Sequence, residues 1–177
     1  KKITDKYINE ISKFLRDCYH VEREVPEYKV FLSDKYEDAV TVIDEKYGIS
    51  IVISNKYMQY SKQSLHPVII HELFHAYNAY DGRNCIYYDG ENIISWLVEG
   101  YTEILVDEFW EYYNYDYVKR CDGTEYKYYC YLVEMFLEND SHLLQQYYFY
   151  KDTAFAIKLN KRLRENAKVS DDFLALG

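Results

Sequence analysis

The sequence predicts an α+β fold, in which a first helix is followed by a small sheet and then by a helical half. Three observations predict it: apolar residues at helical spacing near the start of the chain, short β-branched runs over residues 28–54, and helical periodicity after Ser54. The length of 177 residues suits one domain with a sizeable core, and no internal repeat divides the chain. We therefore predict a single domain over residues 1–177.

The first helix is predicted over residues 4–19. Thr4 and Asp5 are of the residue types that begin helices. Apolar side chains then recur at the spacing of one helix face: Ile8, Ile11, Phe14, Leu15 and Cys18. This pattern is typical of an amphipathic helix with one buried side.

Three short runs, YKVFLSD, AVTVID and ISIVIS, predict the sheet, because β-branched and aromatic residues favour strands. Charged and glycine-containing turns such as EKYG separate the runs. We predict a small, mainly antiparallel sheet over residues 28–54.

The rest of the chain is predicted to be helical. Ser64 and Pro67 open a helix that runs to about Tyr80, and two Asp-Gly turns in DGRNCIYYDG indicate a loop after it. Three further helices are predicted, over residues 92–113, 124–138 and 141–165.

Charge and cysteine spacing narrow the functional classes. A formal net charge of −9 does not suit a surface that neutralises phosphates, so we expect no nucleic-acid partner. No apolar run reaches the roughly 18 residues of a membrane span. The four cysteines form no CxxC pair, which predicts no zinc knuckle, and their even number permits two disulfides without requiring any: Cys18, Cys85, Cys121 and Cys130.

The segment HELFH, residues 71–75, is the main functional signal. Residues four apart lie on the same face of a helix, so His71 and His75 can converge on one zinc ion. Glu72 lies beside that face, where it can take a proton from a water that zinc activates. The surrounding residues are apolar nearly all round the helix, and two histidines with a glutamate are costly in a core without a partner. A bound metal would be the simplest such partner.

A third zinc ligand is needed, and two carboxylates compete for the role. Asp81 fits the frame HExxHxxGxxH/D, with Asn78 where glycine is usual, and this frame resembles the metzincin peptidases. Metzincins also need a methionine in a tight turn, whereas the only downstream methionine, Met135, lies in a predicted helix.

Glu99, in NIISWLVEGYTEILVDEF, is the second carboxylate and the one we favour. Glu99 and Glu103 lie four apart, hence on one helix face, among apolar residues that should pack inward. Gly100 is unfavourable inside a helix. A close approach of this helix to the HELFH helix would explain all three residues.

These two motifs resemble the gluzincin metallopeptidases, and WLVEGYTEIL is similar to the W-L-x-E-G segment of their aminopeptidase branch. The resemblance covers about residues 66–110 and implies a zincin-like metallopeptidase domain that hydrolyses peptide bonds. It implies Zn²⁺ held by His71, His75 and Glu99. It also implies Glu72 as general base and Glu103 as a hydrogen-bond partner of a zinc-bound histidine.

The resemblance implies further features of the substrate site. Gluzincins align the substrate along an edge strand, for which we choose ISIVIS. They commonly stabilise the oxyanion with a Tyr or His, and His142 is the only histidine after the motif. The G-x-M-E-N signature of the aminopeptidases is absent, which favours an endopeptidase acting on peptides or proteins. The alternatives are a catalytically silent zincin-like binding or regulatory module and a metzincin-type peptidase that uses Asp81.

Overall fold

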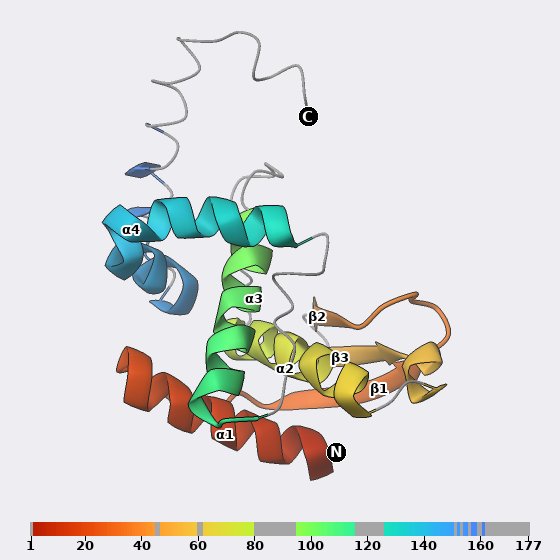
Figure 1. Ribbon diagram of the computed structural model, residues 1–177. Helices are drawn as coiled ribbons and strands as arrows, with labels where there is room; N and C mark the ends of the chain where they lie inside the picture. Colours follow the sequence, from red (N-terminus) through yellow and green to blue (C-terminus); the bar gives the residue numbers. More distant parts are fainter. Residues whose placement is uncertain are drawn as a thin grey trace, which may run out of the picture. The chain divides into compact units, whose positions relative to one another are not determined.

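A computed structural model describes most of the chain (Figure 1). The described residues are 2–44, 47–59, 62–79, 95–115, 126–150, 152, 154, 155, 157, 158 and 161. The chain divides into two compact units, Lys1–Val133 and Glu134–Gly177. Helices and one three-stranded sheet occur together, so the predicted α+β class is confirmed. None of the described helices is long and apolar enough to cross a membrane.

The first helix, α1 (Lys2–Tyr19), is amphipathic as predicted. Its apolar face is buried against the core, and Ile11 and Leu15 are fully inaccessible. Lys13 and Asp17, four residues apart, form an ion pair on the opposite, exposed side. Burial of the apolar face therefore fixes this helix on the core.

The sheet contains β1 (Tyr28–Ser33), β2 (Val40–Asp44) and β3 (Gly48–Ser54) in the order β1-β3-β2. β2 pairs with β3 antiparallel, with Thr41 opposite Ile51, whereas β1 pairs with β3 in parallel, with Val30 opposite Ile51. The sheet is thus mixed rather than mainly antiparallel, because β1 lies on the far side of β3 from its sequence neighbour β2.

This strand order corrects the prediction of the edge strand. ISIVIS forms β3, which is the central strand, and most of its residues are buried. β2 and β1 are the two edges of the sheet. A continuous run of buried apolar residues is typical of a strand with neighbours on both sides, whereas all residues of β2 are partly or fully exposed.

Helix α2 (Lys62–Asn78) follows the short 3₁₀ helix η1 (Asn55–Gln59) and occupies the centre of the first unit. It contacts α1, α3 (Ser95–Tyr112), β2 and β3 (Figure 1). From Ile69 to Ala79 every residue of this segment is buried. Because other elements surround α2, the helix has apolar residues on all its faces and not in a single stripe.

Helix α4 (Lys127–Tyr150) replaces the two helices predicted over 124–138 and 141–165. Asn139 and Asp140 lie within it, because these residues only weakly disfavour a helix and the segment has no Gly or Pro to break it. Its first two turns belong to the first unit. In the second unit Tyr147 and Phe155 are buried, with their ring centroids 6.1 Å apart.

Gly100 lies where α3 meets the first turn of α4. A Cβ atom at Gly100 would lie 2.7 Å from the backbone carbonyl carbon and oxygen of Tyr129. The Sγ of Cys130 donates to the Gly100 carbonyl oxygen at 3.8 Å. The glycine therefore allows a close approach of α4, and not of the HELFH helix as we predicted from the sequence.

We expect Gly100→Ala to destabilise the protein by about 1–3 kcal/mol, the usual range for an overpacked core. The backbone of Tyr129 cannot rotate away as a flexible side chain would, so α4 must shift. Alanine is the better helix former, which offsets about 1 kcal/mol of this cost. Urea unfolding measures the difference, and an unchanged or increased stability would contradict the close packing.

Candidate metal centre

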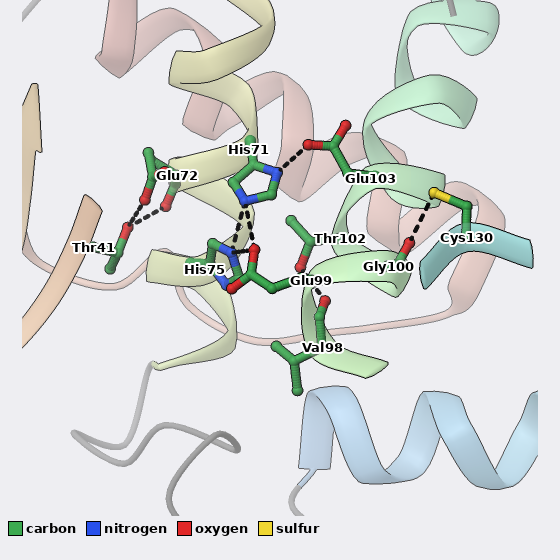
Figure 2. A network of polar contacts seen from close by, with 10 residues as sticks. All are labelled: Thr41, His71, Glu72, His75, Val98, Glu99, Gly100, Thr102, Glu103 and Cys130. Atoms are coloured by element: carbon green, nitrogen blue, oxygen red, sulfur yellow. Dashed lines mark hydrogen bonds and ion pairs between the residues drawn. The ribbon is translucent and has the colours of Figure 1, made fainter. Parts of the chain in front are cut away.

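His71 and His75 lie on α2 and face Glu99 of α3 (Figure 2). The Nε2 atoms of the two histidines are 2.9 Å apart. The Oε2 atom of Glu99 lies 3.1 Å from Nε2 of His71 and 3.3 Å from Nε2 of His75. Both histidines are buried, and the Glu99 side chain is 24% exposed. Three donor atoms from two helices thus form a nearly equilateral triangle that could hold a metal ion.

The dimensions of this triangle fit zinc. Zinc binds histidine nitrogen and carboxylate oxygen at about 2.0–2.2 Å, and tetrahedral angles at that distance place neighbouring ligand atoms about 3.3 Å apart. The observed separations of 2.9–3.3 Å are close to this value. Two histidines and one glutamate are also a common ligand set of catalytic zinc, which keeps its fourth position for water or substrate.

Glu103 supports this arrangement from one turn further along α3. Its Oε1 lies 2.8 Å from the Nδ1 of His71, and its side chain is fully buried. In a neutral His71 this contact keeps the ring proton on Nδ1 and leaves the Nε2 lone pair facing Glu99. Glu103 therefore contacts His71 from the neighbouring helix, and its role toward a zinc-bound histidine stays a prediction.

The carboxylates around His71 and His75 favour a positive charge at this site. Burial on its own would lower the pKa of His71, but the carboxylates of Glu103, Glu99 and Glu72 outweigh burial and raise that pKa to about 10. Burial would likewise raise the pKa of Glu99, yet the imidazoles of His75 and His71 hold it far below its usual range. A proton on His71 balances the carboxylates in part, and a divalent cation between the three ligands would do so more completely.

Glu72 directly follows His71 on α2, and its carboxylate lies against β2 of the sheet. The hydroxyl of Thr41, in β2, lies 2.8 Å from Glu72 Oε2 and 2.9 Å from the Glu72 backbone oxygen (Figure 2). Glu72 is 6% exposed. The candidate general base is therefore linked to the neighbouring edge strand.

A cavity of about 320 Å³ opens onto the group. The backbone segment from Ala39 to Ile43, which contains most of β2, forms one wall. The candidate ligands, Glu72 and Tyr126 complete the lining. The ring centroid of Tyr126 lies 6.0 Å from that of His71. The cavity thus combines three candidate metal ligands, the Glu72 carboxylate and an edge strand of the sheet.

The remaining predicted site residues are placed elsewhere or are not described. Asp81 lies outside the described residues, as do Cys85 and Cys121. His142 is exposed on α4 in the second unit, and its role stays a prediction. Met135 lies on the same helix, as predicted. Cys18 and Cys130 form no disulfide within the part of the chain that the structure describes.

Sequence reasoning missed two residues that line the cavity. Thr41 lies within an ordinary strand pattern, and nothing in the spacing connects it to Glu72, thirty-one residues later. Tyr126 begins a tyrosine-rich segment in which the sequence distinguishes no single residue. Only the tertiary structure, which brings β2 and Tyr126 beside α2, identifies them.

Comparisons with family models, with curated proteins and with solved structures found no match to this chain. The functional conclusion therefore depends on the geometry of the site and on the motifs within it.

Proposed function

We propose that this protein is a zinc-dependent metallopeptidase of the gluzincin type that hydrolyses peptide bonds within a chain. The observation that carries the proposal is the triangle formed by His71, His75 and Glu99, with Glu72 beside it in the same cavity. A zincin-like fold is part of the proposal, and the α+β architecture with HELFH on its central helix supports it.

The chain supplies the ligands and the base. His71, His75 and Glu99 would hold Zn²⁺, which supplies Lewis-acid polarisation of the substrate carbonyl and lowers the pKa of water to near neutrality. Glu72 takes a proton from the attacking water and returns it to the amide nitrogen that leaves. Glu103 keeps His71 oriented through its Nδ1 atom.

The open edge of β2 suits an extended peptide. Among the described strands β2 pairs with β3 alone, so its other side offers backbone N–H and C=O groups that no described strand pairs. This strand also lines the cavity. A substrate segment bound as an additional strand would pass the candidate metal ligands. Main-chain hydrogen bonds of this kind bind a chain along its length, which agrees with endopeptidase activity. The acidic charge keeps nucleic acid outside the proposed partners.

An oxyanion forms during amide hydrolysis and needs a donor. Tyr126 is the tyrosine among the described residues that lines the cavity, and its phenol is the donor that the geometry favours. His142, which we predicted from the sequence, remains the second candidate.

Removal of the metal is the direct test. We expect protein purified without chelator to contain about one zinc per chain, the stoichiometry of a catalytic site with three protein ligands. This protein should cleave members of a broad peptide library. Dialysis against a chelator should abolish cleavage, and one equivalent of Zn²⁺ should restore it. Elemental analysis and mass spectrometry of the digest measure the two results.

Two outcomes would contradict the proposal. A protein that contains no zinc and takes none up would exclude the metal centre. A zinc-loaded protein that cleaves no peptide would instead favour the alternative of a binding or regulatory module that keeps the metal.

A further inference from the structure

Thr41 of β2 forms side-chain hydrogen bonds to α2. Its hydroxyl has one hydrogen and lies within bonding distance of two acceptors, which are the Oε2 and the backbone oxygen of Glu72. Both acceptors belong to the same residue. The contact therefore fixes the carboxylate relative to its own helix backbone, as well as tying the strand to the helix.

The contact also distinguishes the two oxygens of the carboxylate. Oε2 is occupied by Thr41, and Oε1 accepts no hydrogen bond from any residue that the structure describes. Glu72 lines the cavity together with His71, His75 and Glu99. Oε1 is thus the oxygen left for a water or substrate proton.

We propose that Thr41 is a positioning residue that orients Glu72 for proton transfer by holding its Oε2 atom. This inference rests on the proposed peptidase function. A flexible glutamate would adopt several staggered conformations of its side chain, and only some of them present an oxygen to the reacting atoms. A hydrogen bond to a charged group is strong enough to select one of them. The strand that lines the substrate cavity would then also hold the general base in place.

Thr41→Val tests this role, because valine has nearly the same shape, suits a strand and lacks only the hydroxyl. In the zinc-loaded full chain we expect kcat to fall about 10- to 100-fold, the loss that corresponds to one hydrogen bond to a charged group. KM and zinc content should stay within twofold of wild type. Thr41→Ser keeps the hydroxyl and should restore most of kcat.

A binding measurement separates this role from a merely structural one. Acetohydroxamic acid chelates zinc and has a proton to donate to a neighbouring carboxylate. We expect Thr41→Val to weaken its binding about 10-fold when Glu72 is present and to have no effect in a Glu72→Ala background, since the threonine acts through that residue. Calorimetry on the four zinc-loaded proteins gives this comparison.

The outcomes are distinct. An equal loss of binding in both backgrounds, or a serine variant as impaired as the valine variant, would overturn the positioning role. If the wild-type protein binds zinc and the probe but cleaves no peptide, the proposed function fails. The binding cycle then still decides whether Thr41 holds Glu72.

Discussion

Glu72→Gln is expected to lower the kcat for peptide hydrolysis by about 10²- to 10⁴-fold, the usual contribution of a general acid–base group. Glutamine has the same size and can still accept the hydrogen bond from Thr41, but it cannot take a proton from water. Because Glu72 is not one of the three converging ligands, zinc content should be unchanged. Kinetics on a peptide from the library digest, together with elemental analysis, measure both quantities.

The variant also separates the two classes of function. If the protein were a binding module, the glutamine variant would bind its partner as the wild type does and no activity would be lost. A zinc-loaded variant with wild-type kcat would show that Glu72 is not the base. A variant that has lost its zinc would instead indicate that the helix has been disturbed.

Glu99→Ala is expected to weaken zinc binding by about 100- to 1,000-fold. Structural zinc sites in peptides bind with about 10–16 kcal/mol, so one ligand of four corresponds to roughly 3 kcal/mol. The substitution removes the carboxylate that faces both imidazoles and leaves only two ligands. Competition with a chromogenic chelator measures the affinity, and hydrolysis should be lost with the metal.

Two controls make this result specific. Glu111→Ala removes an exposed carboxylate from the same helix and should bind zinc as the wild type does. Asp81→Ala removes the other candidate ligand and should also retain zinc. The opposite pattern, with zinc lost from the Asp81 variant and kept in the Glu99 variant, would favour the metzincin arrangement.

The pattern of apolar residues along the sequence was sufficient to predict three of the helices. The amphipathic period of α1 and the long apolar runs of α2 and α3 define those elements within a few residues. The strands were also placed correctly, but their pairing was not. Parallel pairing of β1 with β3 depends on which strand lies between the others, and no local pattern carries that information.

The candidate site likewise contains residues that local spacing predicts and one that only the tertiary structure reveals. His71, His75, Glu99 and Glu103 are two pairs at a spacing of four on two helices, so helix geometry alone brings each pair onto one face. The contact between the two faces is tertiary: Glu99 and Glu103 of α3 face the two histidines of α2. Thr41 approaches from a strand, and no periodicity connects a strand residue with a helix residue.

On the side facing away from β3, β2 has no partner strand among the described residues, and this has a consequence for the behaviour of the protein in solution. An unpaired edge that accepts a substrate strand is equally able to accept the same strand of a second molecule, which is the usual route to edge-to-edge aggregation. β2 is only five residues long, and exposed Asp38 and Asp44 lie near its two ends. Shortness and like charge oppose self-association. The strand can therefore stay open for substrate while discouraging pairing between copies of the chain.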